Sequence, residues 1–313
     1  MDKYLVTSAP HVRNSATVFS QNLYFIFALL PCVICSVIFT GIDSLLLILV
    51  SVASAYVFDL LFSYLILGKF NYKDISSLLT GLTLGLVLPV KLPIYFALVA
   101  SFIAVVLAKV VFGGEGKGCV DGVSLGVTVL AAIIAGFTTE LCAYTAATGD
   151  LVESPLKLFA EGEFGAVPIT SLILGNGGGL IGTTCIIAIV IGGVFLCCMK
   201  IIDWYMPLLS IVTFVITTLI TKGQTQFLPE LFAGSFVFVS FFIMPTRTGA
   251  PTIWISKFVY AIVFGLIVAF TRNAYVFGEA GVFLCVLLVN LLSPVLDWVF
   301  GLFYQGRRAK KYE

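Results

Sequence analysis

Long apolar segments alternate with short polar connections along nearly the whole chain. A membrane-spanning helix needs about 20 predominantly apolar residues, and ten segments come close to that length. The predicted spans are residues 23–40, 44–67, 75–90, 93–112, 122–142, 170–198, 204–221, 228–246, 252–271 and 277–303. The pattern therefore predicts an all-α integral membrane protein with about ten transmembrane helices.

Breaks in the apolar pattern show that some of these spans are not uniform helices. The third span is short and ends at Pro89, and the sixth begins with the glycine-rich GNGGGLIGTT (175–184). Pro and Gly also interrupt TGLTLGLVLPVKLP (80–93) and MPTRTGAP (244–251), one in each half of the chain. Paired breaks at corresponding positions are typical of inverted-repeat membrane proteins with a site near the membrane midplane. We therefore expect two inverted five-helix repeats with broken helices.

The predicted spans divide the chain into five regions. They are a cytoplasmic N-terminal segment (1–22), a first five-helix half (23–142), an external loop (143–169), a second five-helix half (170–303) and a cytoplasmic basic tail (304–313). The orientation follows from the positive-inside rule, because most Lys and Arg residues near the spans fall on one side. We expect a multi-pass protein of a bacterial plasma or inner membrane, with both termini in the cytoplasm and the loop 143–169 outside.

The composition agrees with a membrane protein. Hydrophobic residues make up 60% of the chain and charged residues 11%, against about 25% charged in an average soluble domain. A net charge of +1 with no large basic patch argues against a nucleic-acid partner. The eight cysteines lie mostly in apolar stretches, which is not the pattern of a disulfide framework or a metal site. Cys32 and Cys35 form a CxxC pair in the first span, where we expect them to pack as small apolar residues.

Ionisable residues inside spans are costly and are usually functional. Asp59 lies near the middle of the second predicted span, so it is a candidate for an ion pathway. A structural carboxylate with a charged partner is the alternative. Lys109 lies near the inner end of the fourth span, where a long side chain can reach the membrane surface. Glu279 and Asp297 flank the last span, and we expect them at the membrane interfaces.

Five blocks in order carry a family resemblance. They are SAPHVRNSATV (8–18), LLTGLTLGLVLP (78–89), AKVVFGGEGKG (108–118), LILGNGGGLIGTTCIIAIVIGGVFL (172–196) and GEAGVFLCVLLVNLLSPVLDW (278–298). They resemble the D subunit of the Rnf complex, an ion-pumping ferredoxin:NAD oxidoreductase. That subunit is related to the B subunit of the sodium-pumping NADH:quinone oxidoreductase.

The resemblance covers nearly the whole chain and implies a function. The chain would be a membrane-embedded, flavin-carrying electron-transfer subunit of a translocase that couples redox transfer to Na+ or H+ movement, and it would not be active alone. Its partners would be the other membrane and soluble subunits of the complex, including a flavin-bearing neighbour. The chain departs from the family pattern in two places. Cys119, Val120 and Asp121 stand near the usual Asn-Pro-Ala, and Gly182-Thr183 stands where Gly-Glu is usual.

The resemblance also implies a covalent FMN, attached by a phosphoester to a Thr in an outward-facing motif of the form Ser/Thr-Gly-Ala-Thr. TAAT (145–148) fits this form with Ala146 in place of Gly, which makes Thr148 the first choice for the acceptor. Ser154, in a later Ser-Pro-Leu, is the alternative acceptor. Without a covalent flavin, the segment would be an ordinary polar loop with turn-forming residues at 149 and 150.

A second, non-covalent flavin, riboflavin, is implied for the membrane part. Gly177, Gly178 and Gly179 could expose backbone N–H groups to the edge of a flavin ring. The same glycines could instead allow close packing of helices.

Two other functions remain open at this point. A secondary transporter or channel with inverted repeats and no flavin would show the same broken helices and midplane carboxylates. A structural membrane subunit without a cofactor would explain the altered neighbourhood of TAAT.

Overall fold

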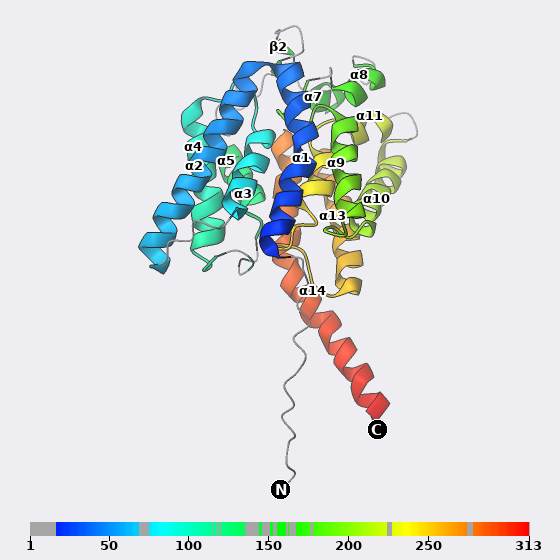
Figure 1. Cartoon of the computed structure of the whole chain (residues 1–313). Helices are drawn as coiled ribbons and strands as arrows, with labels where there is room; N and C mark the ends of the chain where they lie inside the picture. Colours follow the sequence, from blue (N-terminus) through cyan, green and yellow to red (C-terminus); the bar gives the residue numbers. More distant parts are fainter. Residues whose placement is uncertain are drawn as a thin grey trace.

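The computed structural model describes residues 17–68, 75–114, 116, 118, 120–134, 144–145, 151–152, 155–160, 162, 167–175, 178–223, 227–273 and 278–312. Most of these residues form helices that run roughly along one axis (Figure 1). In this part of the chain, five helices are long and apolar enough to cross a membrane. They are α1 (Val18–Thr40), α2 (Ile42–Leu67), α10 (Tyr205–Lys222), α13 (Trp254–Asn273) and α14 (Gly281–Tyr312).

Shorter helices complete the bundle. The apolar ones are α3 (Ser76–Val87), α4 (Ile94–Phe102) with its π-helical continuation η1 (Ile103–Val110), α5 (Gly122–Ile134) and α9 (Ile186–Cys198). The remaining elements are α7 (Pro155–Ala160), α8 (Ile169–Leu174), α11 (Phe227–Phe232), α12 (Phe236–Phe238), the π-helix η2 (Val239–Ile243) and the 3-10 helix η3 (Gly278–Ala280). The two-residue strands β1 (Tyr144–Thr145) and β2 (Leu151–Val152) pair antiparallel.

The prediction of a helical, multi-pass membrane protein is confirmed, and so is the predicted break at the glycine-rich segment. The predicted span 170–198 is divided into α8 and α9 by a non-helical segment at 178–185. The structure adds a break that was not predicted, because the span 228–246 is divided among α11, α12 and η2. Glycine lowers helix stability at such places because it leaves the backbone free to turn.

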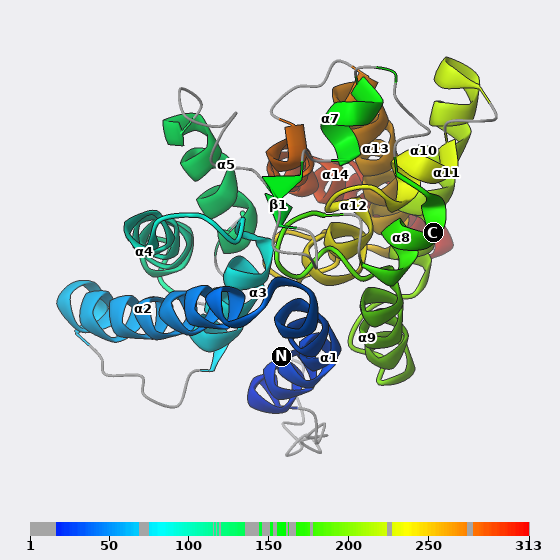
Figure 2. The same cartoon turned by 90° about the horizontal axis from the view of Figure 1, so that it is seen from above.

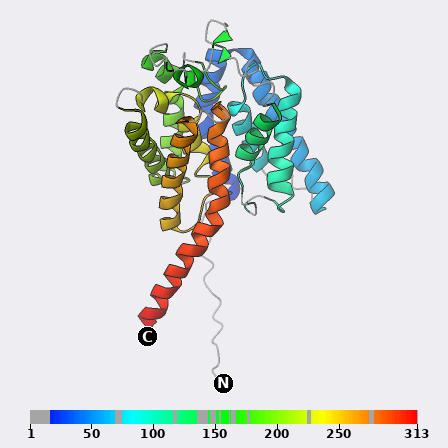
Figure 3. The ribbon, with the colours of Figure 1, turned by 180° about the vertical axis from the view of Figure 1, so that it is seen from behind.

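The elements define two ends of the bundle. The start of α1 and the end of α14 lie at one end, which we call the terminal end (Figure 1). The β1–β2 pair and α7 lie at the opposite end, which we call the loop end. Seen from above, α2 to α5 lie on one side of the molecule and α9, α10 and α13 on the other (Figure 2). The last part of α14 extends beyond the bundle at the terminal end (Figure 3).

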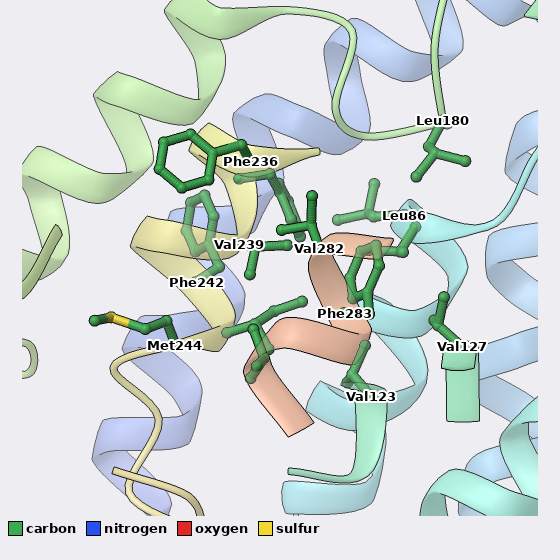
Figure 4. Packing of buried hydrophobic residues seen from close by; sticks show 14 of the residues in the cluster. Leu86, Val123, Val127, Leu180, Phe236, Val239, Phe242, Met244, Val282 and Phe283 are labelled. Atoms are coloured by element: carbon green, nitrogen blue, oxygen red, sulfur yellow. The ribbon is translucent and has the colours of Figure 1, made fainter. Parts of the chain in front are cut away.

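The core lies where the two halves of the chain meet. Side chains from α3, α5, the 178–185 segment, α12, η2 and α14 converge there (Figure 4). Leu86 of the first half and Phe236, Phe242 and Phe283 of the second are all completely buried. Since lipid is as apolar as these side chains, their close packing, rather than escape from water, holds the halves together.

Small residues allow α3 to approach α2 closely. A Cβ atom on Gly81 would lie 2.8 Å from the Ser51 backbone oxygen, and one on Gly85 would lie 2.9 Å from the Ile48 Cα. The Ser51 hydroxyl donates a hydrogen bond to the Gly81 carbonyl at 2.9 Å across this contact. The glycines of TGLTLG therefore serve helix packing, as small residues commonly do in membranes.

The cysteine prediction is confirmed. Cys32 lies in the core with 1% of its surface exposed, and Cys35 packs against the same cluster.

Candidate functional site

A cavity of about 990 Å³ lies inside the bundle at the terminal end. Its walls come from the first turns of α1 and α3, from α2, from η1 with the glycine-rich connection that follows it, and from the segment after η2. Its polar lining consists of Gln21, Asn22, Asp59, Ser63, Ser76, Thr80, Thr83, Lys109, Asp121, Thr246, Arg247 and Thr248. This concentration of polar groups inside an apolar bundle marks the cavity as the candidate functional site.

The first charged feature of the cavity wall is an ion pair between α2 and η1. The Lys109 Nζ lies 3.0 Å from the Asp59 Oδ2, and the Ser63 hydroxyl donates to the Asp59 Oδ1 at 3.4 Å. Asp59 is only 4% exposed. Asp59 therefore has the charged partner that its alternative interpretation, a structural carboxylate, requires. Its role in an ion pathway stays a prediction, to which its place in the cavity wall adds support.

The second charged feature is Asp121, in the connection between η1 and α5. Its Oδ2 accepts a hydrogen bond from the Ser124 N–H at 3.0 Å, so it caps the start of α5. Its Oδ1 accepts from the Thr246 hydroxyl, which belongs to the other half of the chain, at 3.4 Å. Burial raises the pKa of the Asp121 carboxyl above its usual value, and these hydrogen bonds offset only part of the rise. The sequence drew attention to Asp121 only as a departure from the family pattern; its position before an apolar helix was the signal for a capping role.

Asn290, in α14, connects Asp121 to α13 and α14. With its amide oxygen turned toward Asp121, it accepts from the Asp121 N–H at 3.2 Å and donates to the Tyr260 hydroxyl at 2.5 Å. Gly249 leaves room for this amide, since a Cβ there would overlap it. Elements α5, α13 and α14 and the segment after η2 thus meet at one buried carboxylate.

The described part of the glycine-rich segment lies outside the cavity wall. Ile181 and Gly182 donate backbone hydrogen bonds to the carbonyls of Leu88 and Leu86 at 3.2 and 2.6 Å, and a Cβ on Gly182 would lie 2.6 Å from the Leu86 Cβ. This part of the segment therefore packs tightly against the end of α3. Gly178 and Gly179 do not line the cavity, and Gly177 lies outside the described residues. Flavin binding by these three glycines stays a prediction.

The predicted FMN acceptors, Thr148 and Ser154, also lie outside the described residues. Around them, β1 and β2 pair and α7 packs Leu156 and Phe159 against Leu172 and Ala233. The region predicted as an external loop, 143–169, thus includes a helix that is packed onto the loop end of the bundle.

The expected position of Glu279 at a membrane interface stays a prediction, but its side chain is buried in protein and does not face the solvent. It is only 9% exposed and lies against Gly234, where a Cβ would be 2.5 Å from the Glu279 Oε2. Burial follows from the tertiary structure, because η3 contacts both α5 and α7. Asp297 is partly exposed and accepts hydrogen bonds from the Thr252 N–H and hydroxyl, both at 2.8 Å, just before α13.

Apolar helices around a cavity with charged and polar side chains in its wall define a multi-pass membrane protein with an internal site. Comparison with known proteins gives the family. The NQR2, RnfD, RnfE family matches residues 5–301, so the chain belongs to that family. The resemblance found in the sequence is confirmed.

Three curated relatives illustrate the similarity. The chain is 29% identical over 296 residues to the D subunit of the Na+-translocating ferredoxin:NAD+ oxidoreductase complex of Acetobacterium woodii, covering 93% of this chain and 92% of the relative. It is 28% identical to the D subunit of the ion-translocating oxidoreductase complex of Actinobacillus succinogenes, covering 94% and 95%. It is 27% identical to the D subunit of the proton-translocating ferredoxin:NAD+ oxidoreductase complex of Clostridium ljungdahlii, covering 94% and 93%.

Proposed function

We propose that this chain is a flavin-carrying electron-transfer subunit in the membrane part of an ion-translocating ferredoxin:NAD oxidoreductase complex. The match of the family along nearly the whole chain supports this function, and the observation that carries it is the polar cavity inside the apolar bundle. The chain would not be active alone, because ferredoxin and NAD would bind to other subunits. The match favours a redox subunit over a secondary transporter or channel.

The proposal includes ten spans arranged as two inverted five-helix repeats. In the first half α2 packs on α4 and α4 on α5, and in the second half α10 packs on α13 and α13 on α14. Two further contacts, α1 with α9 and α5 with α14, join elements at equivalent places in the two halves. A twofold relation between the halves requires such contacts between equivalent elements, so the packing supports the repeat.

The cavity fits a non-covalent flavin better than the glycine-rich segment does. Its volume of about 990 Å³ is at the upper end of the range of about 300–1,000 Å³ for small-molecule sites. Phe19, Phe25 and Phe242 offer apolar faces for a flat ring, and the hydroxyl-bearing Thr80 and Thr83 lie in the same wall. Lys109 or Arg247 in the lining would stabilise negative charge on the flavin. When bound, riboflavin would supply one- and two-electron transfer, while the chain would position the ring and exclude solvent.

This placement predicts which variant loses riboflavin. Thr83 is 4% exposed and lines the cavity, so Thr83→Trp should fill the space and reduce bound riboflavin several-fold. The measurement is the riboflavin released on denaturation per purified complex, with Thr83→Ser as the conservative control. Gly179→Ala should keep the wild-type content, because a Cβ there meets only ordinary contacts of 3.4 Å or more. Loss in Gly179→Ala and retention in Thr83→Trp would place the flavin at the glycine-rich segment instead.

The proposal further includes FMN attached to Thr148 outside the membrane, with Ser154 as the alternative acceptor. There it would exchange electrons with a flavin-bearing neighbour in the complex. The separation of the β1–β2 pair and α7 from the terminal end supports an attachment site on the side opposite the termini (Figure 1).

Cysteine labelling tests the orientation. In a variant without native cysteines, Asp150→Cys should react with a membrane-impermeant maleimide added to intact cells. Lys73→Cys should react only after the membrane is opened. The opposite result would reverse the proposed orientation and place both termini outside.

The coupling ion is left open by the comparisons. The relatives named for Na+ and for proton translocation are similar to this chain to nearly the same degree, 29% and 27%. The choice between Na+ and H+ therefore depends on which of these ions the carboxylates of this chain bind.

A further inference from the structure

Glu279 is a buried carboxylate whose charge is not matched by a direct partner in the described part of the chain. It is 9% exposed, and neither of its carboxylate oxygens has a hydrogen-bond partner among the described residues. The Ser235 hydroxyl donates to the Glu279 backbone oxygen at 3.3 Å, not to the carboxylate. Gly234, at φ 71°, provides the space beside Oε2.

The neighbouring charged groups make their direct contacts with other residues. Glu230 forms an ion pair with Lys222 through Oε1, while its Oε2 has no hydrogen-bond partner among the described residues. The Arg272 guanidinium donates to the backbone oxygens of Glu230 and Ala233 and lies over the rings of Phe214 and Phe236, 5.2 and 5.6 Å from their centres. In the described residues, Arg272 forms no direct ion pair with Glu279, although its charge acts on that carboxylate from a greater distance and its Nε has no hydrogen-bond partner. A buried carboxylate that lacks a direct partner is costly unless it binds a proton or a cation.

Glu279 and Asp121 occupy equivalent places in the two halves. Asp121 directly precedes α5, the last helix of the first half, and Glu279 lies two residues before α14, the last helix of the second. These two helices contact each other. Asp121 lines the cavity at the terminal end, whereas η3, which carries Glu279, contacts α7 at the loop end.

Element α14 gives the spacing between the two carboxylates. Asn290, whose amide reaches the Asp121 N–H, follows Glu279 by eleven positions. At a rise of 1.5 Å per residue this is about 16 Å along the helix, or roughly half of the hydrocarbon thickness of about 30 Å. The two carboxylates are therefore separated along the direction in which an ion must cross the membrane.

We propose that Glu279 binds the coupling cation at the loop end, as the repeat-related counterpart of Asp121 in the cavity. The ligand class is a small monovalent cation, Na+ or H+, since both are taken up by carboxylate oxygens. This inference rests on the proposed function, because it assigns a residue to the ion route of that same complex.

Carbodiimide labelling tests the site independently of electron transfer. Dicyclohexylcarbodiimide modifies protonated carboxyl groups in apolar surroundings, and mass spectrometry of the Glu279 peptide of the purified complex measures the rate. We expect labelling at Glu279. Slowing by NaCl but not by KCl at constant pH would identify Na+, and slowing only by raised pH would identify H+. No labelling, or labelling insensitive to both, would overturn the proposal.

A transport measurement separates this inference from the proposed function. In proteoliposomes containing the complex, Glu279→Gln should lower the number of ions moved per NAD reduced several-fold, and Glu279→Asp should restore part of it. Glu230→Gln is the matched control, because Glu230 is also buried at the loop end but is paired with Lys222. Loss of that pair should lower the yield of complex, but the complex that assembles should move as many ions per NAD reduced as the wild type. A wild-type ratio in Glu279→Gln would overturn the inference alone. Absence of ferredoxin-dependent NAD reduction in the wild-type complex would overturn the proposed function.

Discussion

Thr148→Val is expected to abolish the flavin fluorescence of the denatured chain. Valine has nearly the shape of threonine but lacks the hydroxyl oxygen that a phosphoester to FMN requires. The covalent link survives denaturation, whereas riboflavin held without a covalent bond is lost. The measurement is in-gel fluorescence of the chain produced together with a flavin transferase, checked by mass spectrometry, which should show one FMN less a water on the wild type and none on the variant.

Ser154→Ala is the control for this experiment, and it should remain as fluorescent as the wild type. A fluorescent Thr148→Val together with a dark Ser154→Ala would assign the acceptor to Ser154. A dark wild-type chain would mean that the altered TAAT motif has lost the covalent chemistry, and it would favour a subunit without attached FMN.

Asp59→Asn is expected to reduce the amount of assembled complex sharply. The change removes the charged carboxylate from its contact with the Lys109 ammonium, whose side chain is 13% exposed. Removal of one partner from a buried ion pair costs about 3–5 kcal/mol. The yield of detergent-purified complex and its thermal stability measure this effect.

The double variant Asp59→Asn/Lys109→Met separates structure from ion transport. Replacement of both charges by groups of similar size is often close to neutral, so assembly should recover to near the wild-type level. If Asp59 belongs to the ion route, electron transfer in the recovered complex should remain poorly coupled to ion movement. Wild-type coupling in the double variant would make the Asp59–Lys109 pair structural only.

The sequence by itself determined the helical segments and the family. Apolar length is a local property, so the predicted spans 44–67 and 252–271 lie within two residues of α2 (Ile42–Leu67) and α13 (Trp254–Asn273) at each end. The break at the glycine-rich segment was also readable, because glycine acts on the backbone where it stands, whereas the break between α11 and α12 was not predicted. The five family blocks likewise needed no three-dimensional information, and the match over residues 5–301 confirmed the family that they indicate.

Only the tertiary structure decided which charged groups meet. Asp59 and Lys109 are 50 positions apart, and Asp121 and Thr246 are 125 apart, so neither pairing appears in a local pattern. The burial of Glu279 depends on α5 and α7, which come from the other half of the chain and from the loop region. The cavity has the same origin, since its walls come from both halves. Hydropathy records what a residue costs in lipid, but the neighbours that offset this cost are set by which helices pack together.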